Sequence, residues 1–410
     1  MSTIQDKVAS ANRLHIAIFG TMNVGKSSLL NAMTGQTVSI VSDKAGTTTD
    51  IVKKTMEIAG IGPCVWIDTA GFDDTTEIGH LRIAATEKAF EQCDVAIVVF
   101  SLNDSAFEKK WIQKMKEHKI PLLGVLSKID RFSLEQKEER IAQLEKEYQI
   151  PVVGFSSVSK EGLDISIQEL KNLTSGSRNV RHVLAGLVKK GDTVVLVMPQ
   201  DEQAPQGRLI QPEVQTIRDA LDQDMIAICI TPSQLENTLH LLKKEPDLVI
   251  TDSQVFSEVF RILPHNIRLT SFSVLMAALK GDIDYLTSSV QTIKELHAGS
   301  KVLIAECCTH RPLEEDIGRV KIPMLLHKKI NSEIQIEVKA GTDFPENASD
   351  YDLIIQCGGC MFNRRYILER ISKAKEQKVP MTNYGIAIAY LNGILDNIVI
   401  PESEEIYDGN

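Results

Sequence analysis

The chain has 410 residues and a formal net charge of −10 at pH 7, with 43% hydrophobic and 24% charged residues. This length predicts two or three domains with cores of their own, and the acidic balance argues against nucleic acid as a partner, because phosphate binding needs a basic surface. No apolar run approaches the roughly 18 residues of a membrane-spanning helix and no signal-peptide core precedes the first predicted strand, so we expect a cytoplasmic protein without a membrane partner.

The first 172 residues alternate short apolar strands with helices. A helix follows the first strand and ends at Gly35, and a second helix spans residues 133–148. Strands that alternate with helices predict a mostly parallel sheet. We expect the first domain to cover residues 1–172, followed by a polar linker at 174–182. The predicted strands of this domain are residues 14–20, 64–68, 94–100, 121–128 and 151–157.

Two further α/β segments follow the linker, at residues 181–262 and 264–410. The third segment begins with a long predicted helix at 273–296, and a second helix covers 363–377. The expected fold is therefore α/β throughout, in three domains. The predicted strands of the two segments are residues 189–199, 224–230, 247–251, 301–306, 352–356 and 380–385.

A Gly-rich turn after the first strand matches the GxxxxGK(S/T) phosphate loop, with a strand before it and a helix after it. Glycine lets backbone N–H groups close around the phosphates. Lys26 supplies a positive charge to the β- and γ-phosphates, and the Ser27 hydroxyl is placed to bind Mg²⁺. The residues expected to contact the nucleotide here are Gly20, Thr21, Asn23, Val24, Gly25, Lys26, Ser27 and Ser28.

Further nucleotide motifs lie at the ends of later strands. Asp68 is placed to hold Mg²⁺ through water, and the Gly71 N–H to sense the γ-phosphate; the loop at 45–50 is placed to supply another Mg²⁺ ligand. Asp130 can accept hydrogen bonds from guanine N1–H and N2–H₂, which selects guanine over adenine. Ser127 and Lys128 precede Asp130, and Ser156 and Ser157 end the next strand, where they are expected to contact the guanine oxygen.

Residues 13–172, with these motifs in this order, resemble the Era and tRNA-modification branch of the translation-factor-related GTPases. The resemblance implies that Asn23 helps to coordinate K⁺ beside the phosphates. It makes Thr48 the switch ligand of Mg²⁺, with Thr47 as the alternative, and Lys26, Asn23, Thr48 and Gly71 the residues that support catalysis. Phe72 stands where signalling GTPases have a water-positioning Gln, so we expect slow hydrolysis. Ser127 replaces the usual Asn of the guanine motif, which predicts weaker guanine affinity.

The 7 cysteines lie in an expected reducing compartment, which favours metal binding or burial over disulfides. Cys357 and Cys360 form a CxxC after one predicted strand, and Cys308 with His310 follows another, so both segments leave the carboxyl edge of a sheet. Three thiolates with a non-cysteine ligand suit a [4Fe-4S] cluster with one labile iron. A structural zinc site with His310 is the alternative. Cys64, Cys93 and Cys229 are expected to be core residues, and Cys307 to point away from Cys308.

Nearly the whole chain resembles the [FeFe]-hydrogenase maturation GTPases of the HydF family, through its domain order and through residues 207–212 and 308–319. The resemblance implies that Cys308, Cys357 and Cys360 bind a [4Fe-4S] cluster. The family pattern has a second His at the position of Gln356. The fourth ligand is therefore open, with His310, Glu306 and water as the alternatives.

The resemblance also implies a scaffold and carrier that binds GTP, GDP and Mg²⁺. Such a protein receives a di-iron precursor, made with the radical-SAM maturases HydE and HydG, and passes it to the [FeFe]-hydrogenase apo-protein. It further implies a homodimer formed by the middle domain. Because Phe72 replaces the water-positioning Gln and a whole domain separates the two sites, we expect GTP to act as a switch on partner association. Two other functions stay open: a zinc-stabilised regulatory GTPase, and an RNA- or ribosome-linked GTPase. Four arginines near the cluster are expected to attract an anionic precursor: Arg311, Arg319, Arg364 and Arg365.

Overall fold

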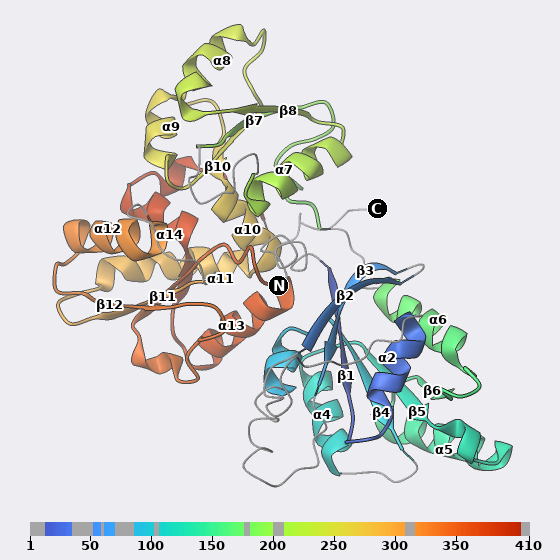
Figure 1. Cartoon of the computed structure of the whole chain (residues 1–410). Coiled ribbons are helices and arrows are strands. Elements are labelled where there is room, and N and C mark those ends of the chain that lie inside the picture. Colours follow the sequence, from blue (N-terminus) through green and yellow to red (C-terminus); the bar gives the residue numbers. More distant parts are fainter. Residues whose placement is uncertain are drawn as a thin grey trace. The chain divides into compact units, whose positions relative to one another are not determined.

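The computed structural model divides the chain into two compact units, Met1–Arg178 and Asn179–Asn410 (Figure 1). Among the residues that it describes, none of the helices is both long and apolar enough to cross a lipid bilayer. The described residues are 13–34, 52–58, 61–69, 86–101, 106–175, 181–199, 209–307 and 316–402.

The first unit contains a six-stranded sheet in the order β2-β3-β1-β4-β5-β6. Every neighbouring pair is parallel except β2 and β3, which are antiparallel. The central strands β4 and β5 are buried along their whole length, as expected for parallel strands covered on both faces. The strands are β1 Leu14–Phe19, β2 Val52–Ile58, β3 Gly62–Asp68, β4 Val95–Phe100, β5 Leu122–Ser127 and β6 Val152–Phe155.

Helices cover both faces of this sheet and form two hydrophobic clusters. Trp111 of α4 and Leu144 of α5 pack on one face, and Leu29 of α2 and Leu170 of α6 pack on the other. Helix α5 starts with a capping box in which Ser133 and Gln136 bind each other's backbone N–H groups. The helices are α2 Lys26–Thr34, α4 Ala106–Glu117, η1 Ile129–Arg131, α5 Leu134–Tyr148 and α6 Leu163–Ser175.

The second unit contains two four-stranded sheets, in the orders β10-β9-β7-β8 and β12-β11-β13-β14. All pairs in both sheets are parallel. The strands are β7 Thr193–Val197, β8 Ile226–Ile230, β9 Leu248–Thr251, β10 Leu269–Ser271, β11 Lys301–Ala305, β12 Gln335–Lys339, β13 Leu353–Gln356 and β14 Met381–Asn383.

One hydrophobic cluster joins strands of both sheets, including Val195 of β7 and Leu303 of β11. Helix α10 packs against α7, α13 and α14, so it links the two sheets. The helices are α7 Gln211–Asp222, η2 Pro232–Gln234, α8 Leu235–Leu241, α9 Phe256–Ile262, α10 Phe272–Lys280, α11 Ile283–Ser288, η3 Ser289–Glu295, η4 Ile317–Lys321, α12 Ile322–Lys329, η5 Ala348–Asp350, α13 Arg364–Glu376, α14 Tyr384–Leu391 and η6 Leu395–Asn397.

The long helix predicted at 273–296 is wrong, because the segment is divided into α10, α11 and η3. Helix α10 ends at Gly281, and Asp282 then accepts a hydrogen bond from the Tyr285 N–H as the cap of a new helix. Strand β10 lies beyond the boundary expected at residues 262–264, and it pairs with β9 in the first sheet of this unit.

The sequence patterns did not predict strands β2 and β12 or helix α14. Both strands lie at sheet edges and carry charged side chains, so they lack the apolar runs of the central strands. Helix α14 is buried almost throughout, and a wholly apolar segment shows no amphipathic period by which to recognise a helix.

Candidate functional site

The phosphate loop lies between β1 and α2, at the carboxyl edge of the first sheet. Gly20 has a φ of +151°, and an added Cβ would lie 2.7 Å from the carbonyl oxygen of Val99 and 2.9 Å from Val24. A side chain at residue 20 would therefore collide with Val99 of β4, the strand that pairs with β1. The loop can approach β4 only because residue 20 is glycine.

Lys26 is 8% exposed, and its ammonium group donates hydrogen bonds of 2.8 Å to the carbonyl oxygens of Gly20 and Thr21. These bonds hold the positive charge inside the loop. Ser27, at the start of α2, is half-buried, and Ser28 is exposed. The amino-terminal turn of a helix provides N–H groups and a partial positive charge, so the arrangement suits phosphate.

Asn23 has a left-handed backbone with a φ of 58° and an exposed side chain. Its carbonyl oxygen accepts a 2.6 Å hydrogen bond from the ammonium group of Lys128. Lys128 comes from the predicted guanine motif, so this contact joins the base-binding segment to the phosphate loop.

Ser127 is 3% exposed and also contacts the phosphate loop. Its hydroxyl lies within hydrogen-bonding distance of the carbonyl oxygens of Val24 and Phe100. A hydroxyl group has a single proton to donate. Because both neighbours are acceptors, the hydroxyl proton is donated to a carbonyl oxygen of the protein. Ser127 therefore connects the end of β5 to the phosphate loop.

Asp130 is held by Ser156, whose hydroxyl donates a 2.7 Å hydrogen bond to its carboxylate. The Ser156 oxygen in turn accepts hydrogen bonds from the backbone N–H groups of Val158 and Ser159. Ser156 is fully buried, whereas Ser157 is exposed. Ser156 therefore orients the carboxylate that was predicted to recognise guanine.

Asp68 ends β3, next to the phosphate loop. Burial raises the pKa of its carboxyl group, while the charges of Lys26 and Lys54 act in the opposite direction. Thr69 donates a 2.6 Å hydrogen bond to the carbonyl oxygen of Ile18 and so fixes the end of β3 against β1. Thr47, Thr48, Gly71 and Phe72 lie outside the described residues.

The cysteine-bearing segments meet at the carboxyl edge of the last sheet. Strands β11 and β13 are neighbours there, with Ala305 paired to Gln356. Cys357 and Cys360 are both half-buried after β13. Cys308, His310 and Arg311 lie outside the described residues. Among the residues that the structure does describe, no group of three His, Cys, Asp or Glu side chains is arranged to hold a metal ion.

Cys307 contacts Cys357 at this edge; because Cys308 lies outside the described residues, the expected opposite orientation of Cys307 and Cys308 stays a prediction. The side chain is 3% exposed, and the Cys307 N–H donates a 3.1 Å hydrogen bond to the sulfur of Cys357. The prediction assumed that the strand continues past Glu306. Strand β11 ends at Ala305, so the alternation of side chains between faces does not extend to Cys307.

Gln356, which replaces the His of the family pattern, is a hydrogen-bond donor to both sulfur atoms. Its amide nitrogen lies 3.1 Å from the sulfur of Cys307 and 3.5 Å from that of Cys357. Its oxygen accepts a 2.9 Å hydrogen bond from Arg370, which fixes the orientation of the amide. In this orientation the Gln356 amide turns its N–H groups toward the sulfur atoms and its oxygen toward Arg370.

The paired thiols differ in their acidity. Mainly through the hydrogen bond with Cys307, the pKa of Cys357 is lowered from its ordinary value of 9.0 to about 7, although burial opposes the effect. Burial raises the pKa of Cys307 well above its ordinary range. The pair therefore favours one negative charge, which resides on Cys357.

Three residues that the sequence patterns did not identify surround the cysteines. Lys280 is 4% exposed and donates hydrogen bonds to the carbonyl oxygens of Gly359 and Phe362, at 2.9 and 3.0 Å. It thereby holds the turn between Cys357 and Cys360, in which Gly359 has a φ of +66°. Arg370 lies over the rings of Phe344, Phe362 and Tyr366. The Tyr384 hydroxyl is buried with no hydrogen-bond partner among the described residues.

Three charged residues named from the sequence are already in ion pairs. Glu306 forms a 3.0 Å ion pair with Arg319, and Arg365 forms a 2.7 Å ion pair with Glu369. Each pair cancels its own local charge. Arg319 and Arg365 therefore attract an anion less strongly than isolated arginines would.

The remaining described cysteines divide between core and surface. Cys64 and Cys93 are fully buried in the first unit, as predicted. Cys229 is exposed, so its prediction as a core residue is wrong. It lies on β8, an edge strand whose apolar residues are not covered within one chain: Ile226 is 55% exposed.

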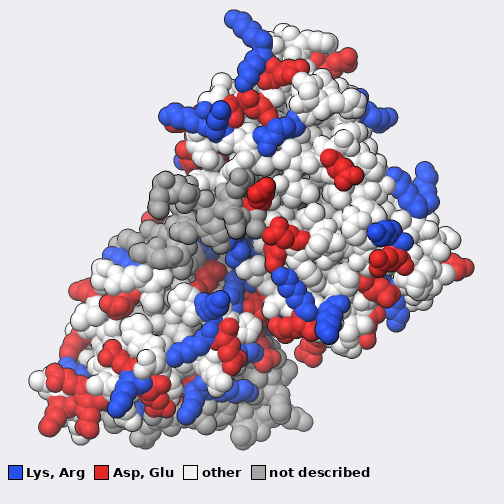
Figure 2. Space-filling model, turned by 180° about the vertical axis from the view of Figure 1, so that it is seen from behind, with Lys and Arg blue, Asp and Glu red and all other residues white. Residues whose placement is uncertain are grey.

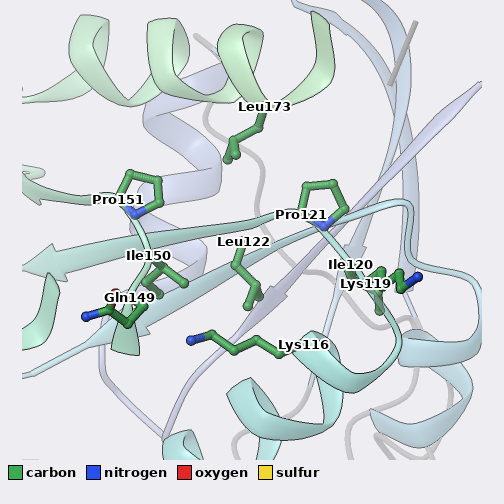
Figure 3. A pocket seen from close by; sticks show the side chains of 9 residues that line it. All are labelled: Lys116, Lys119, Ile120, Pro121, Leu122, Gln149, Ile150, Pro151 and Leu173. Carbon is green, nitrogen blue, oxygen red and sulfur yellow. The ribbon is translucent and has the colours of Figure 1, made fainter. Parts of the chain in front are cut away.

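A hollow of about 370 Å³ lies at the opposite edge of the first sheet from the nucleotide motifs (Figure 3). Its lining comes from the residues before β5 and β6, including Lys119, Pro121, Gln149 and Pro151, and from Lys116 and Leu173. It is therefore not the nucleotide site, because that site is at the carboxyl ends of the strands.

Charged side chains are interspersed over the face shown in Figure 2, with Lys and Arg next to Asp and Glu on both units. Such a mixed face is unlike the concentrated basic stripe of a nucleic-acid-binding surface.

Three stretches of the chain match known protein families. Residues 15–128 match the 50S ribosome-binding GTPase family. Residues 183–281 match the hydrogen maturase F dimerization domain, and residues 284–401 match the hydrogen maturase F tetramerization domain. The last match assigns tetramerization to the segment that contains the cysteine edge.

The chain is also similar to single proteins across its GTPase segment. The tRNA modification GTPase MnmE of Leptospira biflexa is 31% identical over 191 residues, which cover 46% of this chain and 38% of MnmE. MnmE of Nitrosomonas europaea is 37% identical over 154 residues, which cover 37% of this chain and 33% of MnmE. The chain thus spans well under half the length of these curated relatives.

Two solved structures are similar to parts of this chain. The Era structure of Aquifex aeolicus with bound GDP and AlF₄⁻ is 19% identical, with a TM-score of 0.35, and covers 60% of this chain and 97% of its own. The G domain of the Thermotoga maritima FeoB iron transporter is 25% identical, with a TM-score of 0.29, and covers 40% of this chain and 98% of its own.

Proposed function

Because this chain belongs to the hydrogen maturase F family and carries both of its oligomerization domains behind a P-loop GTPase domain, we propose that it is a GTP-dependent scaffold and carrier. In this proposal it binds a [4Fe-4S] cluster and delivers a di-iron precursor to the [FeFe]-hydrogenase apo-protein. The observation that carries the proposal is the position of Cys357 and Cys360 at the sheet edge from which the Cys308 segment also leaves.

The donor set fits an iron-sulfur cluster. The Gln356 amide nitrogen donates to the sulfur of Cys357 as well as to that of Cys307, and N–H···S hydrogen bonds stabilise the negative charge of a cluster. Thiolates of Cys308, Cys357 and Cys360 would hold it, and its labile iron would supply a coordination position for exchange. Glu306 is bound to Arg319 and Gln356 is a donor, which favours His310 or water as the fourth ligand.

We propose that the nucleotide half binds GTP and GDP with Mg²⁺ held by Ser27, Asp68 and Thr48, or by Thr47 in place of Thr48. Asp130, oriented by Ser156, reads the guanine edge. Ser127 contributes through the phosphate loop rather than through the base. In this proposal the hydrolysis of GTP is slow. K⁺ near Asn23 supports it, because the exposed Asn23 side chain belongs to the phosphate loop.

The middle domain forms a homodimer through β8 in this proposal. An edge strand exposes unpaired backbone groups, and Ile226 and Cys229 of β8 are exposed apolar residues. A second copy of the strand would cover both. We place the boundary between the dimerization and cluster-binding domains near Gly281, because β10 belongs to the sheet of the middle domain.

The partners of the proposed carrier are HydE, HydG and the apo-hydrogenase, and its location is the cytoplasm. GTP acts as a switch on these associations. A carrier needs cycles of binding and release more than rapid turnover, which agrees with Phe72 in place of a water-positioning Gln.

Purification without oxygen tests the cluster. Wild-type protein should be brown, with close to four irons and four sulfides per chain as this cluster type requires. Cys308→Ala, Cys357→Ala and Cys360→Ala should lose most of both, while Cys229→Ala on the edge strand should retain them. A colourless protein that contains zinc would instead support the regulatory GTPase.

A further inference from the structure

Cys307 and Cys357 form a thiol pair that the proposed cluster site does not require. The Gln356 amide nitrogen lies 3.1 Å from the Cys307 sulfur and 3.5 Å from the Cys357 sulfur, and the Cys307 N–H lies 3.1 Å from the Cys357 sulfur. Cys307 is 3% exposed, whereas Cys357 is half-buried. Residue 357 is therefore less covered than residue 307.

The backbone geometry allows these cysteines to be bridged. They follow neighbouring parallel strands whose register pairs Ala305 with Gln356. This register places Cys357 one residue away from a position directly opposite Cys307, and the Cys307 N–H already lies 3.1 Å from the Cys357 sulfur. A Cys307–Cys357 bond therefore needs no large movement of either strand.

The surrounding side chains keep the two sulfur atoms together. The Gln356 amide nitrogen contacts both of them, and Arg370 fixes that amide through its oxygen. The same amide therefore holds the two sulfur atoms close to each other. The described part of the chain brings no third metal-binding side chain to this pair.

We propose that Cys307 and Cys357 form a disulfide when the cluster is absent, and that this bond closes the cluster site. The oxidant is a small disulfide such as oxidised glutathione. The Cys357 thiolate attacks it, forming a mixed disulfide and releasing one glutathione thiolate. The Cys307 thiolate then attacks the Cys357 sulfur and releases the second. Two cysteine thiols are oxidised, one glutathione disulfide is reduced, and the two cysteine protons pass to the two glutathione thiolates.

The consequence for cluster loading rests on the proposed function. With its sulfur in a disulfide, Cys357 cannot bind iron, because the thiolate is the metal ligand. Empty carrier would be protected from further oxidation, and it would need a thiol reductant before it accepts a cluster. Cys307 is then the residue that makes loading depend on the redox state of its surroundings.

Peptide mapping of the cluster-free full-length chain tests this inference. The protein is reduced, freed of iron with a chelator, incubated with oxidised glutathione, and alkylated before digestion. We expect a disulfide between the Cys307- and Cys357-containing peptides in the wild type. The bond should persist in Cys308→Ser and Cys360→Ser and be lost in Cys307→Ser. Absence of the bond in wild-type protein, or a bond that persists in Cys307→Ser, overturns the proposal.

Cluster reconstitution separates this inference from the proposed function. Oxidised wild type should take up little iron until a reductant is added, whereas Cys307→Ser treated in the same way should load at once. Loss of the cluster from reduced Cys307→Ser would make Cys307 a ligand and overturn the proposal. If neither reduced protein takes up a cluster, the carrier function fails, while the mapped disulfide still decides the inference.

Discussion

The Ser156 hydroxyl donates a 2.7 Å hydrogen bond to Asp130, and two backbone N–H groups hold the Ser156 oxygen in place. Ser156→Ala should therefore release the Asp130 carboxylate. A hydrogen bond to a charged group contributes on the order of 1 kcal/mol or more, so affinity for GDP should fall about fivefold. Titration with a fluorescent GDP analogue measures it. Ser157→Ala, at an exposed neighbour, should bind as wild type does; equal losses in both variants would contradict the role of Ser156.

Asp130 should determine the choice of base. Its carboxylate accepts from guanine N1–H and N2–H₂, and Asp130→Asn replaces one acceptor with a donor. The variant should lose GTP affinity at least tenfold and bind xanthosine triphosphate better than the wild type does, because xanthine has an oxygen in place of the amino group. Competition between the two nucleotides checks the exchange. Unchanged preference for GTP would remove Asp130 from base recognition.

The monovalent cation should affect turnover through Asn23. Wild-type hydrolysis measured as phosphate release should be several-fold faster in KCl than in NaCl at equal ionic strength. Asn23→Ala should abolish the difference, because the exposed side chain next to the phosphate loop is the expected ligand of K⁺. Met22→Ala, at the neighbouring exposed position, should keep the K⁺ effect. Equal wild-type rates in both salts would rule out the role of Asn23.

The reactivity of Cys357 should follow its lowered pKa. In reduced, cluster-free protein its alkylation by iodoacetamide should reach half its maximal rate near pH 7, since the thiolate is the nucleophile and the pKa is about 7. Cys307→Ala should move the midpoint upward, because it removes the hydrogen bond from Cys307 that is the main cause of the low pKa. Cys64, whose pKa burial raises to about 11, should stay unreactive at pH 7. A midpoint near the ordinary value of 9.0 would contradict this pairing.

The edge strand β8 should carry the dimer contact. Ile226 is 55% exposed there. Ile226→Asp would place a carboxylate in the proposed dimer interface, where the charge would lose its water without gaining an oppositely charged partner. We expect the dimer to dissociate at least tenfold more readily, as measured by sedimentation velocity. Leu241→Asp provides the control, because Leu241 is 83% exposed on α8. Identical behaviour of the two variants would place the interface elsewhere.

Much of the nucleotide site follows from local sequence. The phosphate loop needs glycine at the position where a Cβ would collide with β4. It also needs a strand before it and a helix after it, and the glycine and both flanking elements are visible within a few residues of the sequence. The CxxC pair was identified for the same reason, since its spacing and its place after an apolar strand are local features. Their proximity to the end of β11 required only that β11 and β13 be neighbours in a parallel sheet.

Other features were decided by strand order and by where each strand ends. Cys307 meets Cys357 because β11 stops at Ala305, and Cys229 is exposed because β8 lies at an edge. Lys280 and Arg370 reach the cysteines from helices that are distant in the sequence. Spacing along the chain determines backbone conformation and which residues share a face. Which faces meet depends on packing between distant segments, so the tertiary structure alone shows which side chains surround the sulfur atoms.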